Sequence, residues 1–176
     1  MRQTIMIAMV TSLMCACMLG CEPQEGSGWD PMIQRESGLL NDPRSAPLLT
    51  NEDDVTIDVT FPHDMVRQGD SITLDVTVTN TTDHPIRIDA TTSTKLLVHV
   101  WEQTPVGMER FRGYPENDAQ VMTAWGLKPQ GVYTTALTIP VDRYWPTYEP
   151  LELTVTINGT RIMSDPISLS ALPEKP

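Results

Sequence analysis

The sequence predicts an all-β protein, an antiparallel β-sandwich of seven to nine strands. Apolar and polar residues alternate at every second position along several runs, which is the period of a half-buried strand. Turn-forming residues separate these runs at short intervals, as in folds built from two packed sheets. No segment combines a helical period with capping residues, and 15 prolines spread over the chain disfavour long helices.

Three segments give the strongest strand signals, residues 55–61, 72–78 and 151–157. In each of them Val, Ile, Leu or Phe occupies every second position, and Thr, Asp or Glu stands between. Thr on the polar face is typical of a strand with one face on the core and the other in water. We expect these segments to be the best-defined strands of the sandwich.

Six further segments predict shorter or less regular strands, at residues 86–90, 95–103, 108–112, 119–124, 132–139 and 161–169. Segment 95–103 is apolar on both faces, with Leu96 and Val98 on one side and Leu97 and Trp101 on the other. A strand with two apolar faces lies inside a sheet rather than at its edge. We therefore expect 95–103 to be a central strand.

Turn chemistry separates the strands. Gly69 supplies a turn before segment 72–78, and the polar run 80–85 follows that segment. Asn158-Gly159 is the strongest hairpin signal in the chain. In the two-residue turn that this pair favours, both positions have positive φ.

Two stretches carry a resemblance to known domains. Gly-Asp-Ser-Ile-Thr-Leu at 69–74, followed by Val-Thr-Val-Thr-Asn-Thr-Thr at 76–82 and Pro-Ile at 85–86, resembles the opening of many bacterial immunoglobulin-like domains. Leu-Lys-Pro-Gln-Gly-Val-Tyr at 127–133 looks like the turn that introduces one of their late strands. Residues 55–139 are similar in layout to the bacterial intracellular proteinase inhibitor domain. The resemblance implies an immunoglobulin-like sandwich.

The first 21 residues have the grammar of an export signal. A short basic start precedes an apolar run and a small-residue break, and the run is too short for a membrane-spanning helix. The sequence Met-Leu-Gly-Cys at 18–21 resembles the lipobox of bacterial lipoproteins, with Met18 in place of the commonest residue, Leu. It implies a signal peptide over 1–20 and a lipidated Cys21. The alternatives are an incidental Cys21 in an ordinary signal, and Cys17 as the lipidated residue.

The rest of the chain divides into a tether and a body. Residues 21–50 are rich in Gly, Pro, Ser, Asn and charged residues, which predicts a flexible tether, although several apolar residues within it could dock on the domain. Residues 51–176 form the predicted immunoglobulin-like sandwich, and they are numerous enough for a real core. All three cysteines precede residue 22, so we expect no disulfide in the body.

The acidic balance limits the partners. The formal net charge is −11 and the sequence pI is about 4.5. No basic cluster is present to neutralise phosphates, so nucleic acid is not an expected partner. Acidic residues also repel anionic lipid headgroups, so attachment to the membrane must come from the lipid. We expect an exported protein held at the periplasmic or outer face of the bacterial cell envelope.

The sequence contains little that suggests catalysis. His63, His84 and His99 have no metal-ligand spacing and no cysteine partner in the body, and no nucleophile elbow or phosphate loop appears. We expect no catalytic residue, no metal and no cofactor. The acidic run 51–54 could offer oxygen ligands to Ca²⁺, but a solvated entrance to the first strand is the favoured interpretation.

The loop at 142–150 is the strongest candidate site. It carries Arg143, Tyr144, Trp145 and Tyr148, and residues 112–118, with Tyr114, could form a second wall. Aromatic residues and Arg are enriched at interaction hot spots, although the same rings could instead plug the open end of the sandwich. The predicted function is a non-catalytic binding or assembly module for an envelope protein or glycan. The alternative is a protease inhibitor that presents an end loop.

Overall fold

A computed structural model of the chain describes residues 38–116 and 119–175. This part of the chain contains no α-helix, which confirms the predicted all-β sandwich. Its strands are β1 (Val55–Thr60), β2 (Met65–Arg67), β3 (Ser71–Asn80), β4 (Ile86–Ala90), β5 (Leu96–Thr104), β6 (Gly107–Tyr114), β7 (Thr123–Leu127), β8 (Val132–Pro140), β9 (Pro150–Ile157) and β10 (Ile167–Leu172), with short 3-10 turns at η2 (Pro43–Ser45) and η3 (Glu52–Asp54).

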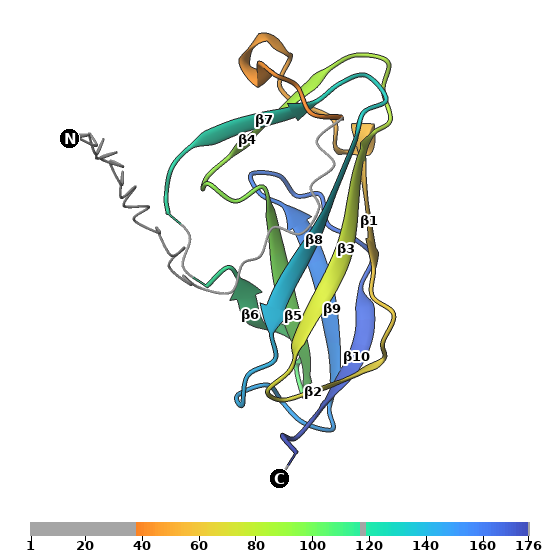
Figure 1. Cartoon of the computed structure of the whole chain (residues 1–176), viewed down its shortest axis with the longest axis vertical. Helices are drawn as coiled ribbons and strands as arrows, with labels where there is room; N and C mark the ends of the chain where they lie inside the picture. Colours follow the sequence, from red (N-terminus) through yellow and green to blue (C-terminus); the bar gives the residue numbers. More distant parts are fainter. Residues whose placement is uncertain (1–37, 117–118, 176) are drawn as a thin grey trace, which may run out of the picture.

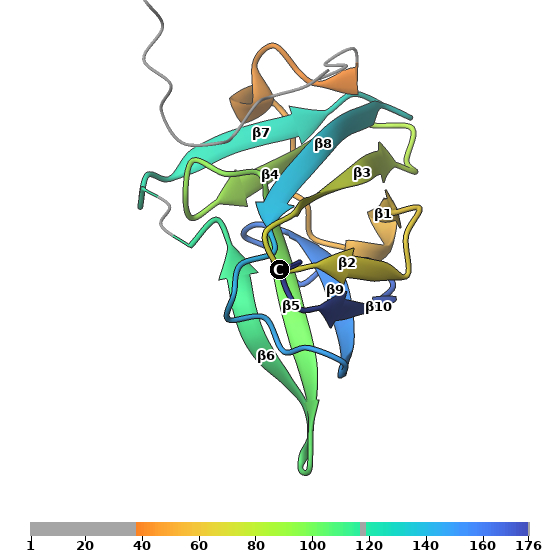
Figure 2. The same cartoon turned by 60° about the horizontal axis from the view of Figure 1, so that its bottom comes forward.

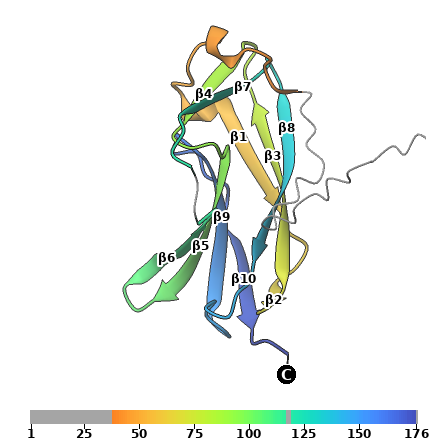
Figure 3. The same cartoon turned by 60° about the vertical axis from the view of Figure 1, so that its left-hand side comes forward.

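The strands form two packed sheets and a separate ribbon (Figure 1). One sheet has the order β1-β3-β8, and the other has the order β2-β10-β9-β5-β6. Figure 3 shows the two sheets as layers that face each other, and Figure 2 shows the ribbon of β4 and β7 lying across one end. All pairs are antiparallel except β2 with β10. β5 has a neighbour on each side, which confirms the expected central strand.

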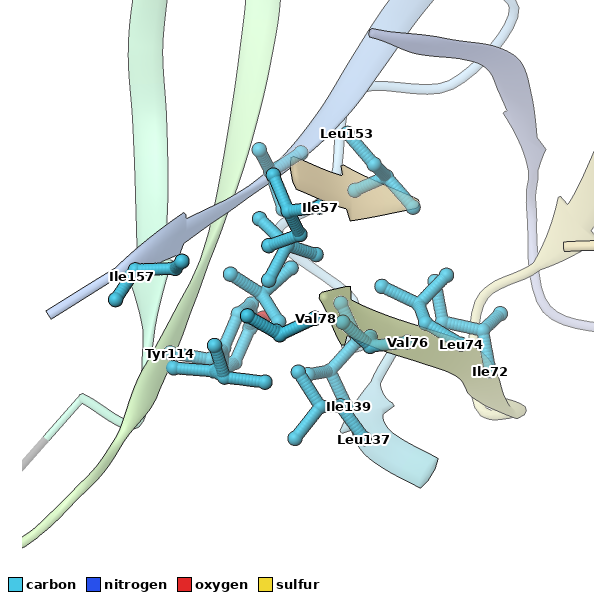
Figure 4. Close-up of a cluster of buried hydrophobic side chains, with 14 of the residues drawn as sticks. Ile57, Ile72, Leu74, Val76, Val78, Tyr114, Leu137, Ile139, Leu153 and Ile157 are labelled. Carbon is cyan, nitrogen blue, oxygen red and sulfur yellow. The ribbon is translucent and has the colours of Figure 1, made fainter. Parts of the chain in front are cut away.

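The core lies between the two sheets and follows the predicted alternation. Residues 72, 74, 76 and 78 of β3 point inward and are almost fully buried, and residues 151, 153, 155 and 157 of β9 face them from the other sheet. Thr and Asp occupy the outward positions of β3. Figure 4 shows part of this layer, with Ile57, Leu74, Val76, Val78, Leu153 and Ile157 among the labelled side chains.

The first two strands of the chain are edge strands of different sheets: β1 belongs to the three-stranded sheet and β2 to the five-stranded sheet. β1 pairs with β3 from Val55 opposite Asn80 to Thr60 opposite Asp75, and the pairing then stops. The chain crosses to the other sheet, where the three residues of β2 pair in parallel with Ser170–Leu172 of β10. β3 begins at Ser71, so its first four residues have a partner strand only on the β8 side.

The middle strand of each sheet, β3 or β9, leads into a buried asparagine at the ribbon end of the molecule. Asn80 is the last residue of β3, and Asn158 follows the last residue of β9. The Asn80 amide donates to the carbonyls of His84 and Lys128 at 2.8 Å, and its oxygen accepts from the backbone of Thr82 at 2.9 Å. Asn158, directly after β9, fixes the loop before β5 by donating to the Thr94 carbonyl at 2.8 Å. Each buried amide is therefore satisfied, and each fastens a loop to the end of its strand.

The end of the predicted tether is part of the folded unit. Leu40 donates a backbone hydrogen bond to Gly126 on β7 at 2.9 Å, and Leu49 donates one to Arg87 on β4 at 2.8 Å. Residues 38–50 therefore run along both edges of the ribbon, and one of them, Ala46, is buried. Covering both edges leaves the ribbon no free edge at these positions.

Most predicted strands are confirmed to within two residues, two predictions need correction, and one strand was missed. The predicted strand 119–124 has the wrong bounds, because β7 runs from Thr123 to Leu127 and Val121 and Met122 are exposed. The last strand runs later than predicted, over Ile167–Leu172. The short strand β2 was not predicted at all, since three residues carry no detectable period.

The Asn158-Gly159 turn also differs from its prediction. Gly159 has φ of +87°, but Asn158 does not have positive φ. The chain still reverses there: Ile157 donates a backbone hydrogen bond to the Ile162 carbonyl at 3.0 Å, so the four residues 158–161, rather than two, form the loop. The asparagine side chain is used to hold the neighbouring loop, which a two-residue turn exposed to solvent would not require.

We predict that Val76→Asp severely destabilises the protein. Val76 is 1% exposed in the middle of β3, so the carboxylate is buried without a partner, at a cost of about 3 kcal/mol or more. The matched control is Val106→Asp, because Val106 is 84% exposed at the tip of the β5–β6 hairpin. Denaturant unfolding followed by circular dichroism measures both. Equal midpoints for the two variants would contradict the assigned core.

Candidate binding site

The loop that connects β8 to β9, residues 141–149, lies at the end of the sandwich opposite the ribbon (Figure 1). We call it the end loop. Asp142 organises its first turn: Asp142 Oδ1 accepts from the backbone N–H of Tyr144 at 2.8 Å, and the Asp142 carbonyl accepts from that of Trp145 at 3.2 Å. Such an aspartate turn fixes the backbone locally. The side chains at 143–145 therefore leave the loop in defined directions.

The turn at 67–70 fastens the end loop from below. The Gln68 amide donates to the carbonyls of Arg143 at 3.2 Å and of Trp145 at 2.9 Å. Gly69 and Val141 are joined by a backbone hydrogen bond of 2.7 Å, and Gly69 has φ of +91°, which favours glycine. The far side of the loop is held by a bond of 2.9 Å from the Tyr148 N–H to the Ala171 carbonyl. The loop is thus tied to the body at several points along its length.

Trp145 closes this end of the core. It is 1% exposed, and its indole N–H donates to the Tyr114 hydroxyl at 3.1 Å. The hydroxyl donates in turn to the Pro140 carbonyl at 3.2 Å, and Tyr114 is itself 4% exposed. Buried Trp and Tyr side chains need partners for their polar atoms, and this chain supplies them.

Arg112, on β6, links the β5–β6 hairpin to the end loop. Its guanidinium pairs with the Asp142 carboxylate and, at 3.2 Å, with Glu116. The ring of Phe111 lies 5.2 Å from the guanidinium carbon and that of Tyr144 lies 6.0 Å from it. Burial alone would lower the pKa of Arg112, but its interactions with Tyr114 and Asp142 outweigh burial and raise that pKa. Arg112 therefore stays charged.

The outward side of the end loop is aromatic and cationic. Tyr144 is 61% exposed and Tyr148 is 73% exposed. The Arg143 guanidinium donates to the Tyr144 hydroxyl at 2.7 Å and lies 4.9 Å from the centre of its ring. The Tyr144 ring thus has two guanidinium groups nearby, from Arg143 and Arg112, within the distance range of cation–π contacts.

The structure divides the five predicted site residues into two groups. Arg143, Tyr144 and Tyr148 are exposed, so a partner can reach them. The prediction that Trp145 and Tyr114 contact a partner is wrong, because both side chains are buried and close the end of the core. The predicted alternative, in which rings plug the sandwich, therefore holds for these two side chains. Within the described residues, Arg112 and Tyr114 of the predicted second wall do contact the end loop.

Two residues that organise the site were not singled out from the sequence. Arg112 lies in the segment predicted as a second wall, but its pairing with Asp142 was not predicted, and nothing near Gln68 in the sequence indicates that it meets the end loop. Asp142 could have been identified from the sequence, since an aspartate side chain in a loop often accepts a hydrogen bond from the backbone N–H two residues later. Long-range pairs such as that of Arg112 with Asp142 have no period or motif to mark them.

The histidines do not converge. His63 contacts the ring of Phe61 at 5.3 Å, and His84 lies beside Asp83 at 3.3 Å. His99 lies on the outer face of β5 by a cavity of about 260 Å³, and its Nδ1 is buried without a hydrogen-bond partner. Burial first, and then the charge of Arg110, lower the pKa of His99, so its imidazole is neutral near pH 7.

The acidic run at 51–54 forms a capped turn at the start of β1. Asn51 accepts from the Asp53 backbone N–H at 3.3 Å and donates to the Asp54 carboxylate at 3.0 Å. Among residues 38–116 and 119–175, no group of three or more His, Cys, Asp or Glu side chains is placed to hold a metal ion. No helix within the same ranges is long and apolar enough to cross a membrane.

No protein-family model matches the sequence, and no curated protein matches it. The sporulation control protein Spo0M from Bacillus subtilis superposes with a TM-score of 0.43 at 12% identity, over 67% of this chain and 49% of that one. The DNA glycosylase AlkC from Pseudomonas fluorescens gives 0.43 at 14% identity, over 67% and 30%. A β-glucosidase from Listeria innocua gives 0.43 at 9% identity, over 68% and 16%.

The chain therefore spans about half or less of the length of these solved structures. At such TM-scores the likenesses identify neither a family nor a function for it.

We predict a large loss of stability on truncating one residue of the end loop and almost none on truncating its neighbour. Trp145→Ala removes a buried indole and should lower the free energy of unfolding by about 3–5 kcal/mol. Tyr144→Ala removes an exposed ring and should change it by about 0.5 kcal/mol or less. Urea unfolding of the two variants, followed by far-UV circular dichroism, makes the comparison. A Trp145→Ala variant as stable as Tyr144→Ala would contradict the closing role of Trp145.

Proposed function

We propose that this protein is a non-catalytic, lipid-anchored module of the bacterial cell envelope that binds a partner through Arg143, Tyr144 and Tyr148. The single observation that carries the proposal is the state of the end loop. Two large tyrosine rings are exposed on a loop whose backbone is fixed by Asp142 and Gln68. Aromatic rings that need no ordering on binding give contact area at low entropic cost.

The position of the loop supports this proposal. Residues 38–50 pack on the ribbon, at the opposite end of the molecule from the end loop (Figure 1). Cys21 precedes Gly38 by 17 residues, so the fully extended chain between them spans at most about 60 Å. A lipid on Cys21 would then be linked to the body at the ribbon end, and a linker of that length leaves the end loop free to lie away from the membrane.

The shape of the loop favours binding in general over protease inhibition. A peptide that lies along a protease cleft is extended, as in strand addition. Residues 142–145 form a tight turn instead, closed by the hydrogen bond from Trp145 to Asp142. The inhibitor remains the alternative function, and the identity of a captured partner distinguishes the two.

We predict that a photo-reactive amino acid at position 144, in the full chain in cells, gives a discrete covalent adduct. The matched control is the same amino acid at position 56, because Thr56 is exposed on β1, on the outer face of the three-stranded sheet and away from the end loop. Tyr148→Ser should reduce the yield at position 144, since the two rings are on one loop. Adducts of the same pattern from positions 56 and 144, or none from 144, would contradict the proposal. A protease as the adduct would support the inhibitor instead.

Lipid attachment is tested separately, because Cys21 lies outside the described residues. Cys21→Ser should move the protein out of the membrane fraction or leave it unprocessed, since the thiol is the proposed site of acylation. Cys17→Ser is the control and should leave processing unchanged. Fractionation and gel mobility report both. A Cys21→Ser protein that fractionates and migrates like wild type would exclude Cys21 as the anchor.

A further inference from the structure

A groove of about 640 Å³ lies where β1 leaves β3. It is bounded on one side by the start of β3. On the other side it is bounded by residues 61–64, which connect β1 to β2, and by β2 itself. We call it the β3 groove. Its lining residues are Phe61, Pro62, His63, Met65, Val66, Asp70, Ser71, Ile72, Thr73 and Asp75.

The backbone of β3 is half open along this groove. β1 pairs with β3 only as far as Asp75, whereas β8 continues to pair down to Ser71. Residues 71–74 therefore have no strand partner on the groove side. An unpaired strand edge is a template for another extended chain.

The walls of the groove suit a peptide with alternating side chains. Val66 and Ile72 are buried at its base, and Met65, at 58% exposure, stands at its rim. Phe61 packs partly against the core, with the His63 ring edge-on at 5.3 Å. Apolar side chains on one face of an added strand would meet these residues, and the other face would point outward.

The outer rim of the groove is negatively charged. Asp70 and Asp75 line it, and within the described ranges no hydrogen bond or ion pair engages either carboxylate. Both residues are exposed. The chain as a whole carries a formal charge of −11, so a cationic segment is also attracted from a distance.

We propose that the β3 groove binds an extended basic segment of a partner protein, which adds as a strand beside residues 71–74. Its apolar side chains lie against Val66 and Ile72, and its Lys or Arg side chains lie near Asp70 and Asp75. The segment takes the place along β3 that β1 leaves at Thr60. This proposal does not rest on the function proposed for the end loop, because it uses different residues.

The test is a titration of the isotope-labelled full chain with the peptide Ac-Lys-Val-Lys-Val-Lys-Val-NH₂, followed by amide chemical shifts. We expect saturable shifts centred on residues 71–75, weakening as salt is raised. Asp70→Asn combined with Asp75→Asn should raise the dissociation constant about fivefold. Asp58→Asn is the matched control, because Asp58 is exposed on the same sheet but does not line the groove.

Two further probes make the outcome decisive. The peptide Ac-Glu-Val-Glu-Val-Glu-Val-NH₂ should not bind, since its charges oppose those of the rim. Spermine, a cation that cannot add as a strand, should bind more weakly than the lysine peptide and should not shift the amides of residues 71–74. Equal binding of spermine and the lysine peptide, shifts away from the groove, or equal effects of the double variant and Asp58→Asn would each overturn the proposal.

Discussion

The rest of this structure depends on burying the apolar faces of two central strands, β3 and β9, against each other. Each lies inside its own sheet, and every inward side chain along most of their length is almost fully buried. Fully burying one Val, Leu or Ile side chain contributes about 1.5–3 kcal/mol. The layer sets the distance between the sheets, and the buried Asn80 and Asn158 then fix the loops that leave the two strands at the ribbon end.

A sandwich of this kind has open ends that must be closed. The ribbon closes one end with buried side chains such as Ile88 and Trp125, which also belong to the main core. Trp145 closes the other end, and Tyr114 satisfies its indole N–H. Because Trp145 is anchored inward, its neighbour Tyr144 is held outward. The closing of the core and the exposure of the Tyr144 ring therefore have the same structural cause.

Irregular pairing at the edges gives the molecule its surface features. The pairing of β1 with β3 ends at Thr60. Residues 71–74 of β3 are therefore unpaired on that side, and the groove lies beside them. At the far edge of the larger sheet, the register of the β5–β6 pairing shifts between Val100 and Trp101, so Phe111 is opposite no residue of β5. The Phe111 ring lies beside the Arg112 guanidinium. Such irregularities redirect side chains and interrupt edges that would otherwise be uniform.

The sequence by itself determined the fold class, the three strongest strands and the central position of β5, because burial on one or both faces of a strand leaves a period in the chain. It also located the end loop, but it could not say which ring would turn inward. Only the tertiary structure decided that Trp145 is core and Tyr144 is surface, through contacts with Tyr114, Gln68 and Arg112 from distant parts of the chain. Local patterns record the periodic burial of a strand, whereas a loop side chain is placed by the space and partners that other elements leave for it.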